Sequence, residues 1–248
     1  MEPIYVQNYT VDDACVDRYG RMKPSAILYI AQEMGGRHSA LMSLDYDTLA
    51  RRKLFWAVTR HRVEVTRMPA LGETLRVETW PLPTTRAAFP RSVVAYDSQG
   101  NEVFRCITLW VLMDLDTRKM IVPGKSGIIV AGTLRGNELP APGGLIPLPL
   151  GAQKCRTVAF TDLDRNGHMN NTRCMDWIAD LLPSRFHQSH SITDFTVCYL
   201  AEAREQQELR LNWEMTDGTL QVDASTGEGE DAHRVFSAKL FFESSGVL

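Results

Sequence analysis

The sequence lacks several features that mark whole classes of protein. No apolar run approaches the ~18 residues that a membrane-spanning helix needs. The first residues, MEPIYVQNYT, show neither a basic segment followed by an apolar one nor a Ser/Arg-rich transit pattern. The five cysteines are odd in number, widely scattered and form no C-x-x-C pair, which argues against a disulfide framework, a zinc site or a redox motif. We therefore expect a soluble cytoplasmic protein with no membrane insertion.

The chain also lacks a strong charge of either sign. A net charge of −3 gives no general attraction to nucleic acid or to an anionic membrane, so we expect no nucleic-acid partner. Hydrophobic residues make up 44% and charged residues 23%, which is typical of a globular protein. A length of 248 residues suits one large domain or two of about 120.

Proline and glycine are concentrated in one stretch. Five prolines and seven glycines lie between Thr117 and Gly151, a density that interrupts helices and strands alike. We interpret residues 117–152 as an interdomain linker, partly extended around GGLIPLPLG. This predicts an N-terminal domain over residues 1–116 and a C-terminal domain over residues 153–248.

The two halves predict the same order of elements. In the first half, hydrophobic spacing predicts a short strand at IYVQNYT and a long helix from Pro24 to about Leu44. In the second half it predicts a strand near 155–160 and a helix from about Thr172 to Leu182. Alternating patterns then predict four strands in each half, near 54–68, 73–82, 86–97 and 102–113, and near 192–201, 206–215, 219–225 and 233–242.

A repeat in residues supports the repeat in elements. VDRYGRMKPS (16–25) aligns with LDRNGHMNNT (163–172) at an offset of 147 residues. Asn166 and His168 of the second copy correspond to Tyr19 and Arg21 in the first, the pattern left by duplication and loss of chemistry in one copy. A long helix wrapped by a curved antiparallel sheet, occurring twice, predicts an α+β protein of two tandem hotdog domains. Adjacent glycines 35 and 36 in the first helix then indicate close helix-to-sheet contact.

The segment DLDRNGHMNN allows three readings. Asp162, Asp164 and Asn166 have the spacing of a calcium loop, but Arg173 occupies the position of the essential glutamate and the preceding CRTVAF is strand-like. A purely structural turn is the second reading, with Gly167 reversing the chain and an asparagine capping the next helix. It does not need His168, and a histidine in a turn is more often structural than catalytic.

The third reading is a hydrolytic site at the start of a helix. Free backbone N–H groups there, with the Asn166 amide, can stabilise a developing oxyanion. His168, with an ordinary pKa of about 6.5, suits the activation of water near neutral pH. Asp164 is placed to fix the imidazole tautomer or to share the water. Because no strong covalent nucleophile is evident, such a site requires an activated acyl group, for example a thioester.

Five segments carry a resemblance over nearly the whole chain: FWAVTRHRVEVTRMPALGETLRVETWP, RAAFPRSVVAYDSQGNEV, TLWVLMDLDTRKM, DLDRNGHMNNTRCMDWIADLL and YLAEAREQ. They resemble the acyl-acyl carrier protein (acyl-ACP) thioesterases, the plant plastid enzymes and their bacterial relatives. The D-x-N-x-H-x-N-N core is the most specific piece. The resemblance implies two tandem hotdog domains with a single active site in the second.

The resemblance also implies residue roles. Asp164, Asn166 and His168 are expected to be catalytic, together with Glu202 on the following strand. Plant relatives place a cysteine directly after that glutamate, where this chain has Ala203. Cys198 lies ~13 Å from Glu202 along a strand, too far to replace it. We therefore expect hydrolysis by activated water with no cofactor, because the substrate itself carries the phosphopantetheine.

The implied substrate is a fatty acyl chain on a small acidic carrier protein. Its candidate contacts are the basic residues Arg51, Arg52, Lys53 and Arg204, although a solvated loop is the favoured reading of the first three. Asn170 and Asn171 are candidate substrate-binding residues beside the catalytic set. Met34 and Trp56 are candidates for lining an acyl slot in the N-terminal domain.

Other functions share these features. Acyl-coenzyme A is an alternative donor for the same hydrolysis, and a non-catalytic hotdog protein that binds and senses acyl thioesters is a different class. A hydratase-type hotdog is less favoured, because it would process an enoyl chain without releasing thiol. Tandem hotdog domains already form a pseudo-dimer, so both a monomer and a homodimer are consistent with the sequence.

Overall fold

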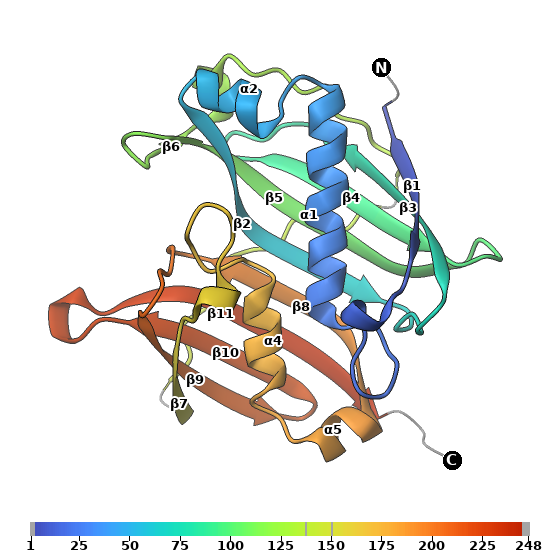
Figure 1. Cartoon of the computed structure of the whole chain (residues 1–248), viewed down its shortest axis with the longest axis vertical. Helices are drawn as coiled ribbons and strands as arrows, with labels where there is room; N and C mark the ends of the chain where they lie inside the picture. The colour runs from blue at the N-terminus through green and yellow to red at the C-terminus, as the bar shows by residue number, and fades with distance from the viewer. Residues whose placement is uncertain (1–2, 137, 150, 245–248) are drawn as a thin grey trace. The chain divides into compact units, whose positions relative to one another are not determined.

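A computed structural model describes residues 3–136, 138–149 and 151–244 of the chain. The chain divides into two compact units. Unit 1 comprises Met1–Met22 and Ala26–Pro142, and unit 2 comprises Lys23–Ser25 and Gly143–Leu248. Each unit contains an antiparallel sheet and a few helices (Figure 1). None of the described helices has the length and apolarity that crossing a bilayer requires.

Unit 1 is built on an antiparallel sheet. Its strands follow the order β1-β3-β4-β5-β2, and the short β6 pairs with β5. The strand bounds are β1 Tyr5–Thr10, β2 Leu54–Val65, β3 Thr74–Pro81, β4 Phe89–Tyr96, β5 Glu102–Asp114 and β6 Met120–Ile121. The helices are α1 Pro24–Leu41, α2 Tyr46–Arg51 and α3 Pro123–Ser126.

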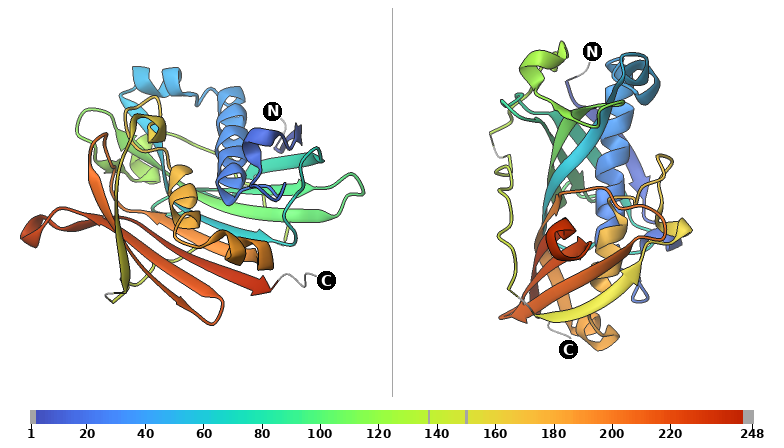
Figure 2. Two further views of the ribbon diagram at one scale, coloured as in Figure 1. Left: turned by 60° about the horizontal axis from the view of Figure 1, so that its bottom comes forward. Right: turned by 90° about the vertical axis from the view of Figure 1, so that its left-hand side faces the viewer.

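Helix α1 lies across one face of the unit 1 sheet (Figures 1 and 2). A Cβ atom on Gly35 would lie 3.2 Å from Cδ of Arg91, so the predicted close helix-to-sheet contact is confirmed there. The same prediction is wrong for Gly36, which faces open space. Helix α1 ends earlier than predicted because Ser43 adopts the left-handed conformation, with φ of 57°. The chain then enters α2, capped by Asp45, which the hydrophobic pattern did not reveal.

Unit 2 repeats the architecture with strand order β8-β11-β10-β9-β7, all pairs antiparallel. The strand bounds are β7 Ala152–Thr157, β8 His190–Tyr199, β9 Glu208–Thr216, β10 Thr219–Thr226 and β11 His233–Ser244. The helices are α4 Arg173–Ala179 and α5 Ser184–Ser189. In both units, every predicted strand is present within a few residues of its predicted bounds.

Helix α4 is shorter than the sequence predicted. It ends at Ala179 rather than near Leu182, because the proline at 183 disfavours helical backbone in the residue before it and opens α5 instead. Within the helix, the apolar residues Cys174, Trp177 and Ile178 are buried. Seven residues of helix therefore stand where about eleven were expected.

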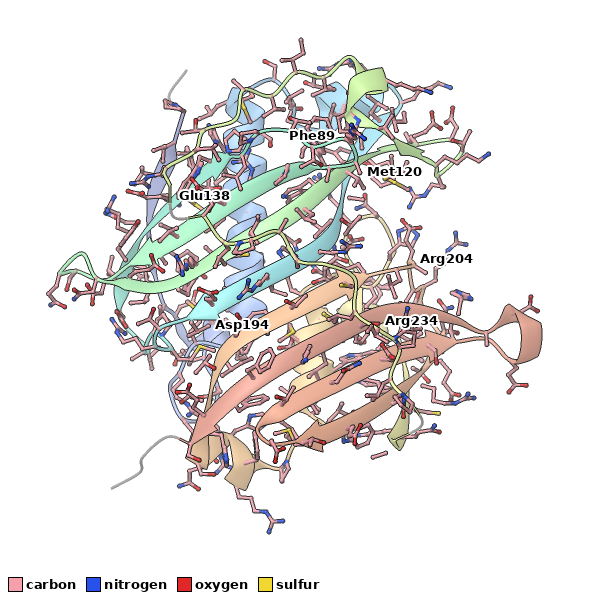
Figure 3. The ribbon with its side chains drawn as sticks, turned by 180° about the vertical axis from the view of Figure 1, so that it is seen from behind. Phe89, Met120, Glu138, Asp194, Arg204 and Arg234 are labelled. Carbon is pink, nitrogen blue, oxygen red and sulfur yellow. The ribbon has the colours of Figure 1, made fainter. Side chains whose placement is uncertain are left out.

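The predicted linker is only partly irregular. Strand β6 and helix α3 fall inside residues 117–152. Farther along, the Thr133 N–H donates to the Pro81 carbonyl at 2.9 Å, and this part of the connection crosses the unit 1 sheet on the side away from α1, where Figure 3 labels Glu138. The Leu148 N–H donates to the Asp223 carboxylate of unit 2 at 2.6 Å. The connection is thus hydrogen-bonded to the sheet of each unit, while the domain limits at 116 and 153 stay a prediction.

Candidate active site

The segment 163–169 forms a tight turn organised by Asp164. The Asp164 N–H donates to the His168 carbonyl at 2.8 Å, and the Gly167 N–H donates to the Asp164 carbonyl at 3.0 Å. Gly167 has φ of +76°, which explains the glycine. The Asp164 carboxylate accepts the N–H groups of Asn166 at 2.8 Å and His168 at 3.4 Å, and the Asn166 side-chain amide at 3.3 Å. This carboxylate therefore holds the turn that presents His168.

Unit 1 contains the same turn without the chemistry. There the Asp17 carboxylate accepts the N–H groups of Tyr19 at 2.8 Å and Arg21 at 3.0 Å, and Gly20 has φ of +71°. The Asp17 N–H likewise donates to the Arg21 carbonyl at 2.8 Å. Because the aspartate does the same work in both copies, the turn itself is structural. The groups peculiar to the second copy are the amide and the imidazole.

The His168 side chain lies next to that of Glu202, the glutamate expected at the site. A backbone bridge joins His168 to Arg204, and the Met169 N–H donates to the Ala203 carbonyl at 2.8 Å, which sets the turn against the segment after β8. Nε2 of His168 then lies 3.3 Å from Oε2 of Glu202. The histidine side chain is 18% exposed and the glutamate 45%. The structure thus brings an imidazole and a carboxylate together where water can reach both.

Unit 1 lacks a counterpart of Glu202, just as it lacks the imidazole and the amide. The bridge there joins Arg21 to Ala70, and the Met22 N–H donates to the Pro69 carbonyl at 2.8 Å. Matching these bonds to those of unit 2 puts Met68 in the place of Glu202. Neither member of the imidazole–carboxylate pair has a chemical counterpart in the first copy.

The backbone N–H groups before α4 are mostly occupied. Asn170 donates to the Asp162 carbonyl at 2.8 Å, while Thr172 donates to the Asn170 side-chain oxygen at 3.0 Å. Arg173 donates to the Asn170 carbonyl at 2.9 Å. The expectation of several free N–H donors at this helix start is therefore wrong, because the side-chain oxygen and the carbonyl of Asn170 accept two of them. The Asn171 N–H makes no hydrogen bond to any residue that the structure describes, and its counterpart in the first copy is Pro24, which has no N–H.

The Asn171 carbonyl accepts two side-chain donors. The Tyr199 hydroxyl lies 3.1 Å from it and the Cys174 sulfur 2.9 Å. Burial raises the pKa of the Cys174 thiol to about 12, so this cysteine remains a protonated donor at neutral pH. No pattern in the sequence indicated the contact of Tyr199 or of Cys174 with this carbonyl.

The Asp162 carboxylate fastens α4 to the preceding turn. It accepts hydrogen bonds from the Ala159 N–H at 3.1 Å, from Nε of Arg173 at 3.3 Å and from Nε1 of Trp177 at 3.3 Å. A calcium loop would need this carboxylate as a ligand. Within the described ranges, no group of three or more His, Cys, Asp or Glu side chains is arranged to hold a metal ion.

Comparison with known families accounts for this arrangement. Residues 2–123 match the family model described as the acyl-ACP thioesterase N-terminal domain, and residues 151–237 match that of the acyl-ACP thioesterase C-terminal domain. The chain belongs to the acyl-ACP thioesterase family. The resemblance read from the sequence is thereby confirmed.

Individual members of the family are moderately similar to this chain. A dodecanoyl-acyl-carrier-protein hydrolase of Cinnamomum camphora is 31% identical over 163 residues, covering 62% of this chain and 43% of that protein. A palmitoyl-acyl carrier protein thioesterase of Gossypium hirsutum is 26% identical over 194 residues, covering 75% of this chain and 47% of that protein. The chain thus spans about half the length of these curated relatives.

Solved thioesterase structures show the fold. An acyl-ACP thioesterase from Bacteroides thetaiotaomicron superposes with a TM-score of 0.84 at 24% identity, covering 97% of this chain and 98% of that one. The 12:0-ACP thioesterase from Umbellularia californica gives 0.82 at 23% identity, with 99% of each chain covered. The prediction of an α+β protein with two tandem hotdog domains is confirmed.

Of the predicted acyl-slot residues in unit 1 of this thioesterase-family chain, one lies in the core and the other, Trp56, is partly buried against it. Met34 is buried in α1. Nε1 of Trp56 donates to the Leu44 carbonyl at 3.1 Å, and the indole packs edge-on against Phe89 with ring centroids 5.0 Å apart. These contacts are those of an ordinary core, so contact with an acyl chain stays a prediction for both.

The predicted carrier-binding residues differ in whether they already form hydrogen bonds or ion pairs within the protein. Nζ of Lys53 lies 2.5 Å from the Asp116 carboxylate, Arg52 donates to the Ser126 carbonyl at 3.3 Å, and Arg51 donates to a threonine hydroxyl at 3.0 Å. Arg204, labelled in Figure 3, is exposed, and its guanidinium has no ion pair within the described part of the chain. A backbone bridge joins Arg204 to His168, so Arg204 is the predicted basic residue that lies beside this turn.

Proposed function

We propose that this protein hydrolyses fatty acyl-ACP to free fatty acid and holo-ACP by direct attack of water on the thioester. The observation that carries the proposal is the 3.3 Å contact between His168 and Glu202 beside the catalytic turn. Unit 1 has the same turn with neither group. A purely structural turn would not need an imidazole and a carboxylate in one copy alone.

Proton transfer from water is the first chemical step. When Nε2 of His168 carries hydrogen and donates to Glu202, the lone pair is on Nδ1, which takes a proton from water. The resulting hydroxide adds to the carbonyl carbon, and the carbonyl electron pair moves onto oxygen. The Glu202 carboxylate stabilises the imidazolium formed in this step. Asp164 keeps its role in holding the turn, and we assign it no proton transfer.

Collapse of the tetrahedral intermediate releases the thiol. The oxyanion needs a preorganised donor, and the N–H of Asn171, which has no acceptor among the described residues, supplies one, with the Asn166 side chain as a second candidate. As the carbonyl re-forms, the carbon–sulfur bond breaks and the imidazolium returns its proton to the leaving thiolate. The products are a fatty acid and the free phosphopantetheine thiol of the carrier, and no separate cofactor is required.

Neither Cys174 nor Cys198, the cysteines of α4 and β8, is suited to form an acyl-enzyme intermediate. Ala203 stands next to Glu202, and Cys198 is buried with its sulfur 3.7 Å from the Gly143 carbonyl. The Cys174 thiol is buried and has a pKa raised to about 12. Because the thiolate is the reacting form of cysteine, neither buried group is activated for attack.

The carrier protein and the acyl chain complete the proposal. Relatives whose names specify acyl-carrier-protein substrates favour that donor over acyl-coenzyme A for this chain. Arg204 is our first candidate for meeting an acidic carrier near the site, and residues 51–53 are weaker ones. Cytoplasmic location and the choice between monomer and homodimer stay predictions.

Parallel turnover assays test the function. Purified protein is given dodecanoyl-ACP or dodecanoyl-coenzyme A, and free thiol and fatty acid are both quantified. We expect faster turnover of the carrier-linked substrate, and a His168→Ala loss of about 10²–10⁴-fold in kcat with folding retained. The matched control is Arg21→Ala at the equivalent position of unit 1, which should keep near-normal kcat. Normal turnover by the His168→Ala variant would show that the motif is only a structural turn. A strong preference for dodecanoyl-coenzyme A would show that acyl-coenzyme A, not acyl-ACP, is the donor.

A further inference from the structure

The Asn171 region holds two peptide groups in fixed orientations. The peptide before Asn171 is fixed through the Asn170 carbonyl, which accepts the Arg173 N–H at 2.9 Å. The peptide after it is fixed through the Asn171 carbonyl, which accepts the Tyr199 hydroxyl at 3.1 Å and the Cys174 thiol at 2.9 Å. Since a carbonyl oxygen has two lone pairs, these two donors satisfy it fully.

Both donors are peculiar to the second copy. In unit 1 the two N–H groups that follow β2, those of Thr66 and Arg67, both donate to the Val103 carbonyl. In unit 2 the two that follow β8, those of Leu200 and Ala201, both donate to the Val235 carbonyl. This match puts Val65 in the place of Tyr199. The offset of the repeated turn puts Ile27 in the place of Cys174 and Pro24 in the place of Asn171. The copy that lacks the free N–H therefore also lacks both side chains that hold its neighbour.

We propose that Tyr199, assisted by Cys174, is a positioning residue for thioester hydrolysis, because it fixes the Asn171 peptides so that the Asn171 N–H is held ready for the oxyanion. The inference rests on the proposed function. Tyr199 itself does not touch the reacting atoms in this account. It acts through the hydrogen bond that its side-chain hydroxyl donates to the Asn171 carbonyl. Tyr199 ends β8, the strand that leads to Glu202, so one strand positions both the Asn171 backbone and the glutamate.

The shared acceptor predicts redundancy between the two donors. Removing either donor leaves the other in place on the Asn171 carbonyl, whereas removing both leaves this carbonyl without a donor, so that only the Thr172 and Arg173 hydrogen bonds to Asn170 still hold the Asn171 backbone. Loss of a single oxyanion donor typically lowers kcat by about 10²–10³-fold. We therefore expect falls of about 3- to 10-fold in kcat for Tyr199→Phe and Cys174→Ala separately, and about 100-fold or more for the double variant, with KM changed by less than about twofold.

The test is a kinetic double-mutant cycle on dodecanoyl-ACP with these three variants. Cys174→Ser keeps a donor and should rescue most of the loss. The matched control is Cys198→Ala. It removes a second buried thiol, which lies in β8 and contacts the Gly143 carbonyl instead. Amide ¹⁵N order parameters of residues 170–172 provide a readout independent of turnover, and in the double variant they should fall towards the flexible range, below about 0.6.

The outcomes separate the two proposals. An active wild type whose double variant keeps normal kcat and rigid amides at 170–172 would overturn the positioning role alone. A loss in the double variant that appears only in KM, or that Cys198→Ala reproduces, would overturn it too. A wild type that hydrolyses neither thioester would overturn the proposed function and this inference with it.

Discussion

Replacing Glu202 by glutamine keeps the side-chain size and removes the charge that faces His168. In the structure, the two side chains meet at 3.3 Å, with the glutamate 45% exposed. Two unit charges at that separation attract by about 1 kcal/mol in water and by about 5 kcal/mol at an effective dielectric constant of ~20. Solvent screening of a half-exposed carboxylate favours the lower end, about 1–2 kcal/mol, which corresponds to roughly tenfold in rate.

The two residues should not act independently. If Glu202 works by stabilising the imidazolium, its charge has no effect once the imidazole is gone. We expect kcat to fall by about 10-fold for Glu202→Gln and by about 10³-fold for His168→Ala. The double variant should match His168→Ala to within about threefold rather than show the product of the two effects.

Initial rates of thiol release from saturating dodecanoyl-ACP give the four kcat values of this cycle. Thermal unfolding of each variant checks that the half-exposed substitution leaves the fold intact. A double variant slower than His168→Ala by a further factor of about ten would contradict the reasoning. Glu202 would then act on water or substrate by itself, and the imidazole–carboxylate pair would not be the working unit.

Three further predictions concern groups outside this pair. Burial lowers the pKa of His61 to about 3, so acidification protonates the unfolded chain first. Between about pH 7.5 and about pH 5 His61 should cost on the order of 2 kcal/mol of stability, and urea unfolding should show a flatter pH dependence in His61→Asn. In the native protein a thiol reagent should modify exposed Cys155 rapidly and buried Cys174 only after unfolding, and fast labelling of the latter would contradict its burial. Gly20→Ala and Gly167→Ala should each lower the free energy of unfolding by about 1 kcal/mol, because both glycines have positive φ. Only Gly167→Ala should lower kcat. Equal kcat values in the two variants would show that the geometry of the second turn does not affect the reaction.

Much of the fold was predictable because its signals are local. Alternating hydrophobic residues marked every long strand, and the duplicated decapeptide revealed the repeat. The helix ends were less predictable, since they depend on single residues. Ser43 stops α1 through a left-handed φ, and Pro183 separates α4 from α5, whereas hydrophobic spacing continues through both positions.

The residues of the candidate site could be named from the sequence, but their hydrogen bonds could not. Asn166 and His168 stood out because the first copy lacks them, while Asp164 does the same structural work in both copies. The pairing of His168 with Glu202 joins segments far apart in the chain, and only the resemblance pointed to it. Tyr199 has no local signal at all, because its contact is to a backbone carbonyl of another element.

Direct attack of water on the thioester is tested most simply by a single turnover in ¹⁸O-labelled water, with enzyme in excess over dodecanoyl-ACP and the fatty acid analysed by mass spectrometry. Direct attack predicts that the first product molecule carries one ¹⁸O atom. Unlabelled fatty acid from that first turnover, with ¹⁸O appearing in the Glu202 carboxylate, would show that the carboxylate attacks the substrate and would contradict the account.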